Sequence, residues 1–138
     1  ILVDEIHSVV IATVDQDGKP VTRVIDMMYQ DGETVYFLTA NTKAFYLQLR
    51  EKPFLSLTGM TQGKDSMHRK SISFTGRIKH IGKEKLDILL ENNPYMYDIY
   101  PTEEARRVLE VFKFESAEGE FYDLTVLPPQ SFPIQIGR

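Results

Sequence analysis

The sequence contains no cysteine and only three histidines among its 138 residues. The absence of cysteine excludes thiolate catalysis, iron–sulfur ligation, zinc–thiolate sites and disulfides within the chain. His7, His68 and His80 do not have the helical spacing of metal ligands, so we interpret each as a surface or hydrogen-bonding residue and expect no metal site. The fold must therefore be stabilised by packing.

Long apolar runs are also missing, because no stretch is long enough to cross a bilayer and no signal-peptide pattern opens the chain. The net charge of −4 argues against a general nucleic-acid or anionic-membrane surface, although it leaves room for a local basic pocket. We therefore expect a cytoplasmic protein that binds neither nucleic acid nor membrane. The first residue is Ile1 rather than Met, which leaves open whether an N-terminal segment is missing.

Several catalytic motifs are absent as well. The sequence has no Ser–His–acid set, no Gly-rich phosphate loop of the nucleotide-hydrolase type and no G-x-G-x-x-G fingerprint. We therefore name no catalytic side chain. What the chain does contain is 42% hydrophobic residues, including eight phenylalanines and seven tyrosines, without internal repeats or linkers. This composition predicts a single domain over residues 1–138 with a substantial core.

Asp-Gly pairs mark the turns of the first half. One β run covers residues 8–15 and ends at Asp17-Gly18, a second covers 20–29 and ends at Asp31-Gly32, and a third covers 34–38. We expect an antiparallel meander of these three strands. Further strands are predicted at 54–60, 70–81, 108–115 and 120–124, with a turn at Glu118-Gly119 and helices at 42–50, 83–91 and after Pro101. Six or seven strands with short peripheral helices indicate a mainly β fold with some α, an antiparallel split β-barrel.

Two cations in the first third of the chain suggest an anion site. Arg23 lies in the middle of an apolar β run, and Lys43 lies in the first turn of a predicted helix for which Asn41 and Thr42 are good N-caps. A helix N-terminus favours anions, yet no acidic residue follows until Glu51. Taken singly, Lys43 fits a solvated surface lysine and Arg23 fits a partner of Asp26 or another carboxylate. Together they favour phosphate binding.

Alternation in the second strand leaves both of its faces partly apolar. Val21, Arg23, Ile25 and Met27 point one way, while Thr22, Val24, Asp26 and Met28 point the other. One face can fill a barrel, but the other needs a cover, because small soluble proteins seldom expose large apolar patches. A homodimer is the simplest cover.

The segment HSVVIATVDQDGKPVTRVIDMMYQDGETVYFLTANTKAFYLQLREKP resembles the flavin-binding split-barrel proteins related to pyridoxamine 5′-phosphate oxidase. The resemblance rests on the order and spacing of the first hairpin, the RVID segment at Arg23 and the YFLTANTK segment that ends at Lys43. It points to the branch that includes nitroimidazole-reductase-like and general-stress-protein-like members. The resemblance implies bound FMN at a homodimer interface.

The same resemblance implies roles for particular residues. Arg23 and Lys43 would hold the FMN phosphate, and Thr39, Ala40 and Thr42 would donate from hydroxyl and backbone groups. Val24, Ile25 and Asp26 would line the flavin ring. Lys70 and Ser71 would reach the flavin of the neighbouring subunit, although Lys64, His68, Arg69 and Lys70 also fit a solvated basic loop. Tyr95, Tyr97 and Tyr100 receive no role.

The implied activity is FMN-dependent oxidation or reduction of a small planar molecule, with NADH or NADPH as an electron donor. We do not expect pyridoxamine-phosphate oxidase activity itself, because the C-terminal PPQSFPIQIGR lacks that enzyme's Arg-x-His element. Two alternatives stay open. One is a non-catalytic flavin or haem carrier or sensor on the same barrel, and the other is a purely structural dimer.

Overall fold

The computed structural model describes residues 2–32 and 34–137. Its strands are β1 (Ser8–Val14), β2 (Pro20–Asp26), β3 (Tyr29–Gln30), β4 (Val35–Ala40), β5 (Phe54–Met60), β6 (Lys70–Gly82), β7 (Leu109–Asp123) and β8 (Gln130–Ile136). They form one antiparallel sheet in the order β2-β1-β5-β6-β7-β4-β3, and β8 pairs with β7. The predicted mainly β fold is confirmed, with eight described strands in place of six or seven.

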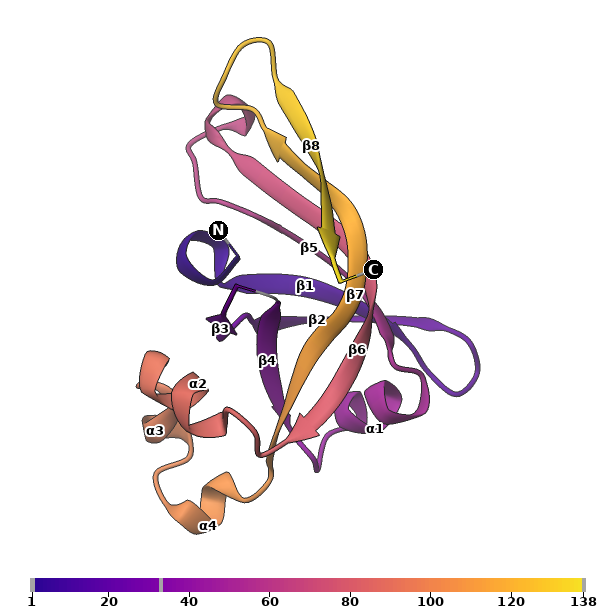
Figure 1. Cartoon of the computed structure of the whole chain (residues 1–138), viewed down its shortest axis with the longest axis vertical. Coiled ribbons are helices and arrows are strands. Elements are labelled where there is room, and N and C mark those ends of the chain that lie inside the picture. The colour runs from indigo at the N-terminus through magenta and orange to yellow at the C-terminus, as the bar shows by residue number, and fades with distance from the viewer. Residues whose placement is uncertain (1, 33, 138) are drawn as a thin grey trace.

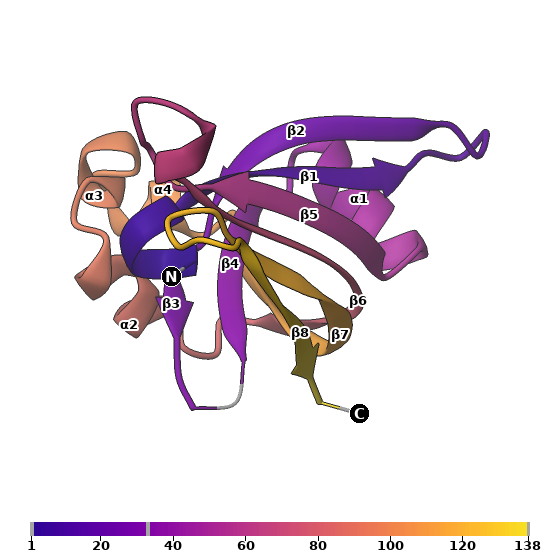
Figure 2. The same cartoon turned by 90° about the horizontal axis from the view of Figure 1, so that it is seen from above.

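The sheet is curled into a half-barrel (Figures 1 and 2). Strands β2 and β3 lie at opposite ends of the strand order, yet only Met27 and Met28 separate them along the chain. Such a link spans at most about 11 Å between the flanking Cα atoms. The two ends of the sheet must therefore approach each other, which is the geometry of a split barrel.

The described helices are short and flank the sheet. A π-helix, η1 (Leu2–Ile6), precedes β1, α1 (Ala44–Glu51) joins β4 to β5, and a 3-10 turn, η2 (Ser66–His68), precedes β6. The helices α2 (Leu86–Asn92), α3 (Met96–Ile99) and α4 (Glu103–Arg106) lie along the chain between β6 and β7 and gather at one end of the molecule (Figure 1). Among the described residues, no helix is long and apolar enough to cross a membrane.

Strand β4 shows how the core is divided. All six of its residues are buried, because its two faces pack into different clusters. Val35 and Phe37 contribute to the barrel core, in which the Phe37 and Phe112 rings stack with centroids 5.6 Å apart. Tyr36 and Leu38 belong to a second cluster beneath α2 and α3. Burial of one such aromatic side chain stabilises the fold by about 1.5–3 kcal/mol, so β4 joins the barrel firmly to the helices.

The predicted meander of the first three strands is wrong. The Asp17-Gly18 turn does join β1 to β2, and the Asp31-Gly32 segment does lie between β3 and β4. However, β4 pairs with β7 rather than with β2, and β1 has β5 as its second neighbour. The chain therefore crosses from one end of the sheet to the other after Asp26, which leaves β2 as an edge strand.

The predicted turn at Glu118-Gly119 is also wrong, because β7 runs unbroken through both residues. Gly119 pairs with Phe74, and a Cβ atom at position 119 would lie 2.0 Å from the backbone oxygen of Ser73. Glycine is required here by the close approach of two strands rather than by a turn. The C-terminal segment, for which no strand was predicted, forms β8 against the outer half of β7.

Candidate cofactor site

Arg23 lies on β2 opposite Ile11 of β1, and its side chain reaches α1. Its Nη1 donates to Thr13 Oγ1 and its Nη2 donates to Gln48 Oε1, each at 3.0 Å. The guanidinium carbon lies 4.4 Å from the centroid of the Phe45 ring. All of these partners are neutral, so the structure holds a positive charge in place without a negative one beside it.

The absence of a counterion distinguishes Arg23 from an ordinary ion-paired arginine. Within the described ranges, no carboxylate lies within ion-pair distance of it, and the expected alternative of a pair with Asp26 is wrong. Partial burial lowers the pKa of the Arg23 guanidinium, because burial disfavours the charged form. An anion bound nearby would restore part of that lost solvation.

Lys43 is the exposed N-cap residue of α1, one residue later than the predicted caps. Asn41 and Thr42 lie in an exposed turn before it, so their prediction as N-caps is wrong. The helix has no side-chain cap bond and no acidic residue in its first turn. The first turn of the helix therefore supplies no acidic side chain to its unpaired backbone N–H groups and positive dipole end. Since Phe45 and Gln48 of the same helix touch Arg23, α1 connects the two cations.

Thr39 and Ala40 end β4 and are only 6% and 4% exposed. They pair with Glu110 and Leu109 of β7, so their side chains are largely enclosed by protein. Thr42 is exposed, and its hydroxyl is open to a ligand. Of the three residues predicted to donate to a phosphate, only Thr42 presents its side chain at the surface.

The edge position of β2 suits the predicted contact with a planar ring. Val24 is 67% exposed on the outer face of the strand, whereas Ile25 packs against the barrel core. No described strand pairs with the second edge of β2, and an edge strand presents unpaired backbone N–H and C=O groups. A flat polar ring placed along this edge would find both an apolar surface and backbone hydrogen-bond partners.

Asp26 ends β2 in a cluster of polar side chains. Its Oδ1 accepts a hydrogen bond from Ser8 Oγ at 2.5 Å, and its Oδ2 accepts one from Tyr95 Oη at 2.6 Å. The Nε2 atom of His7 lies 3.0 Å from Tyr95 Oη and 3.4 Å from Asp26 Oδ2. Tyr95 received no role from the sequence, because it lies 88 residues from His7 and no local pattern relates the two.

Lys70 and Ser71 are not brought to the other predicted site residues within this chain. They begin β6, where they pair with Asp123 and Tyr122 at the far end of β7. The 13 residues of β6 extend about 40 Å along the strand, and α1 lies near the opposite end (Figure 1). Strands β1 and β5 lie between β6 and β2 in the sheet, so within this chain no strand pairing brings Lys70 or Ser71 to Arg23.

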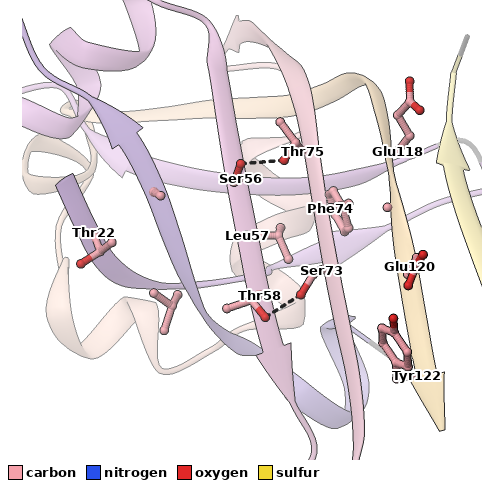
Figure 3. A pocket seen from close by; sticks show the side chains of 13 residues that line it. Thr22, Ser56, Leu57, Thr58, Ser73, Phe74, Thr75, Glu118, Glu120 and Tyr122 are labelled. Atoms are coloured by element: carbon pink, nitrogen blue, oxygen red, sulfur yellow. Dashed lines mark hydrogen bonds between the residues drawn. The ribbon is translucent and has the colours of Figure 1, made fainter. Parts of the chain in front are cut away.

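A shallow groove of about 520 Å³ follows the outer face of the sheet. Its floor carries two cross-strand hydroxyl pairs, Ser56–Thr75 at 2.6 Å and Thr58–Ser73 at 2.7 Å (Figure 3). The remaining lining residues are Val10, Ala12, Thr22, Leu57, Phe74, Glu118, Gly119, Glu120 and Tyr122. The groove thus lies between the exposed face of β2 and two glutamates of β7.

Comparison with solved structures places this geometry among known folds. The chain is similar to a NimC/NimA family protein from Clostridium acetobutylicum, with 20% identity, a TM-score of 0.75, and coverage of 96% of this chain and 88% of that one. It is similar to a pyridoxamine 5′-phosphate oxidase-related, FMN-binding protein from Nostoc punctiforme, with 12% identity, a TM-score of 0.61, and coverage of 96% and 88%. These likenesses show the fold.

A third similar structure is a heme-binding protein from Mycobacterium smegmatis, with 11% identity, a TM-score of 0.68, and coverage of 95% of this chain and 54% of that one. No curated protein matches the sequence. Residues 2–123 match the family described as pyridoxamine 5′-phosphate oxidase. Because this match covers most of the chain, the protein belongs to the pyridoxamine 5′-phosphate oxidase family.

Proposed function

We propose that the protein binds FMN and uses it as an oxidoreductase cofactor. The observation that carries the proposal is the charge of Arg23, which is held by Thr13, Gln48 and Phe45 without any carboxylate. Arg23, Lys43 and the N–H groups that open α1 would hold the phosphate, and Thr42 would donate its hydroxyl. Ionic hydrogen bonds of this kind are about twice as strong as neutral ones.

The flavin ring would lie along β2, as the resemblance implies for Val24, Ile25 and Asp26. Val24 offers an exposed apolar surface, and the free edge of β2 offers backbone donors and acceptors. Bound FMN supplies hydride and electron transfer. The residues of this chain would bind it, orient its ring and cover part of it.

A homodimer would complete this site. Val10 lines the groove on the outer face and is 42% exposed. Val24, its partner on β2, is 67% exposed. A second copy would cover this apolar surface and would bring its own Lys70 and Ser71 toward the flavin. Subunits that share a site in this way would lose cofactor when they separate.

The substrate is proposed to be a small planar molecule, reduced with electrons from NADH or NADPH. Oxidation of pyridoxamine phosphate is not proposed, because residues 128–138 contain no Arg-x-His element. In the structure, Phe132 and Pro133 of this segment pair with Phe121 and Glu120 of β7.

The cofactor proposal is tested by the ligand that copurifies with the full chain. We expect a flavin absorption spectrum, the mass of FMN, and bleaching by NADH or NADPH that air reverses. Apoprotein that neither retains FMN nor binds it when supplied would overturn the proposal. A deazaflavin mass would correct the cofactor while leaving the phosphate site intact.

A carrier or sensor is the second candidate, because a heme-binding protein shares the fold. A Soret band without a flavin spectrum would favour haem. Bound flavin that neither NADH nor NADPH reduces would favour a non-catalytic flavin carrier.

The dimer is tested by substitution at two matched valines of β1. Val10 lines the groove and is 42% exposed, whereas Val14 is 40% exposed and lies outside the groove lining. We expect Val10→Lys to shift the protein toward monomer in sedimentation velocity and to release FMN, and Val14→Lys to do neither. A wild-type monomer that retains FMN would contradict the shared site.

A further inference from the structure

The polar cluster at the end of β2 forms a continuous hydrogen-bonded chain. Tyr95 Oη donates to Asp26 Oδ2 at 2.6 Å. Tyr95 Oη also lies 3.0 Å from His7 Nε2. Burial, followed by the hydrogen bond and charge of Asp26, raises the pKa of Tyr95, so the phenol stays protonated at neutral pH. Since its proton is given to Asp26, Tyr95 can only accept from His7.

This direction of bonding determines the tautomer of His7. The proton on Nε2 must face Tyr95, which leaves Nδ1 as the nitrogen that gains or loses a proton. Among the described residues, none bonds Nδ1. The imidazole can therefore change its charge without breaking the chain to Asp26. Asp26 Oδ2 lies 3.4 Å from Nε2.

The backbone of His7 adopts a left-handed conformation. Its φ of 60° lies in a region that residues other than glycine, asparagine, aspartate and histidine seldom adopt. The His7 N–H donates to the Leu2 carbonyl at 2.6 Å, and the His7 carbonyl accepts from Met27 N–H at 2.7 Å. Left-handed residues other than glycine gather at functional sites. Here the two bonds aim the ring at Tyr95.

The cluster is also accessible to a ligand. The side chains of His7 and Asp26 are 31% and 27% exposed, and Tyr95 is 38% exposed. Asp26 lies on the same face of β2 as exposed Val24, two residues earlier. On the proposed function, this is the segment that lines the flavin ring.

We propose that His7 donates a proton to the substrate from Nδ1, with Tyr95 and Asp26 as the residues that position it. This inference rests on the proposed function. Reduction of a quinone to a hydroquinone takes one hydride and one proton. Bound FMN would supply the hydride when reduced, and His7 would supply the proton from Nδ1 of its imidazolium. Neutral His7 keeps its Nε2–H bond to Tyr95, and water then returns the proton to Nδ1.

Few titratable groups surround His7. Asp26 faces it from β2, Tyr95 faces it from the residue that precedes α3, and Asp4 and Glu5 precede it in η1. None of these groups is basic. The described residues place no lysine or arginine in the chain of hydrogen bonds.

The first test needs no cofactor. Nitrogen-15 NMR of the apoprotein should find neutral His7 as the Nε2–H tautomer, and Tyr95→Phe should release this preference. His68 is the internal control, because its Nδ1 lies 2.6 Å from Asp65 Oδ1 and predicts the opposite tautomer. Neutral His7 with its proton on Nδ1 would overturn the inference.

The second test follows reoxidation of the FMN-loaded, prereduced protein by 1,4-naphthoquinone as a function of pH. His7→Asn keeps a residue that tolerates the left-handed backbone but cannot transfer the proton. We expect FMN affinity to stay within about threefold and reoxidation at low pH to slow about 100-fold, with loss of the pH dependence. His68→Asn should behave as wild type.

The outcomes separate the two proposals. Suppose that the wild-type protein binds FMN. If His7→Asn then keeps the wild-type rate and pH profile, or if the wild type shows no pH dependence, the proton-donor inference is overturned. The cofactor proposal stands in either case. If the wild type binds no FMN, the cofactor proposal fails and the proton step fails with it. The tautomer of His7 would still report whether the hydrogen-bonded chain exists.

Discussion

The two ends of α1 differ in how positive charge is balanced. At the N-terminal end, Arg23 has only neutral partners and Lys43 caps a helix without an acidic first turn. At the C-terminal end, Arg50 Nη1 lies 3.0 Å from His80 Nδ1, and His80 Nε2 lies 2.8 Å from Glu110 Oε1. The cations at the C-terminal end share a carboxylate, whereas no carboxylate of the described residues lies within ion-pair distance of Arg23 or Lys43.

At the C-terminal end of α1, which we call the balanced end, the chain of contacts extends from His80 to Glu110 and Lys83. Glu110 also accepts from Lys83 Nζ, 2.9 Å from its second oxygen, so one carboxylate serves two basic groups. Cations at a helix C-terminus are stabilised by the dipole, whereas cations at the N-terminus are not. The comparison teaches that the C-terminal cations share a carboxylate of the chain, whereas Arg23 and Lys43 have no ion pair among the described residues. On the proposed function, the FMN phosphate would balance these two charges.

The largest expected effect comes from breaking the balanced end. Glu110→Gln leaves Lys83 and His80 without their carboxylate, and we expect a loss of about 2 kcal/mol in the free energy of unfolding, reduced from the fully buried case because Lys83 is half exposed. Urea denaturation measures it. Glu115→Gln, which breaks an exposed 3.4 Å pair with Arg77, should cost less than about 0.5 kcal/mol. Equal losses would remove the distinction between the two pairs.

The contact of Glu110 with Lys83 and His80 should also make the free energy of unfolding depend on pH. Burial alone would raise the pKa of Glu110, but hydrogen bonds from Lys83 and His80 outweigh it and lower that pKa. A lowered folded pKa means stability that is present above the unfolded value of 4.5 and lost as the pH falls through the folded value. Wild-type unfolding free energy should therefore fall over this window more steeply than that of Glu110→Gln. Parallel curves would contradict the prediction.

The unbalanced end should lose little stability when its charge is removed. Arg23→Met keeps an unbranched side chain beside Phe45, and Thr13 still donates to Gln48 at 2.8 Å. We expect the apoprotein's free energy of unfolding to change by about 1 kcal/mol or less. Urea denaturation without ligand is the measurement. A loss as large as that of Glu110→Gln would mean that Arg23 is chiefly a structural residue.

Local signals in the sequence were sufficient for most of the elements. Strand β5 has the predicted bounds, α1 covers Ala44–Glu51 where a helix was predicted at 42–50, and α4 follows Pro101 as predicted. Each of these rests on neighbours within a few residues. The turn predicted at Gly119 failed because a glycine needed for close strand approach looks the same in sequence as a glycine needed for a turn.

The candidate site was predictable in part. The type and strand of Arg23 pointed to an anion, but its partners Thr13 and Gln48 come from β1 and α1 and are set by the curl of the sheet. The contact of His7 with Tyr95 depends on the whole crossing from β2 to the helices. Lys70 and Ser71 remain a prediction, because their proposed contact belongs to another subunit.

The most direct measurement is the dissociation constant of Arg23→Met for FMN and for riboflavin, with Arg77→Met as the control arginine. The two ligands differ only in the phosphate, so a lost phosphate contact should weaken FMN about 10- to 100-fold and leave riboflavin within about threefold. Lys43→Met should act in the same direction. Equal weakening of both ligands, or no weakening of either, would contradict an anion site at the N-terminal end of α1.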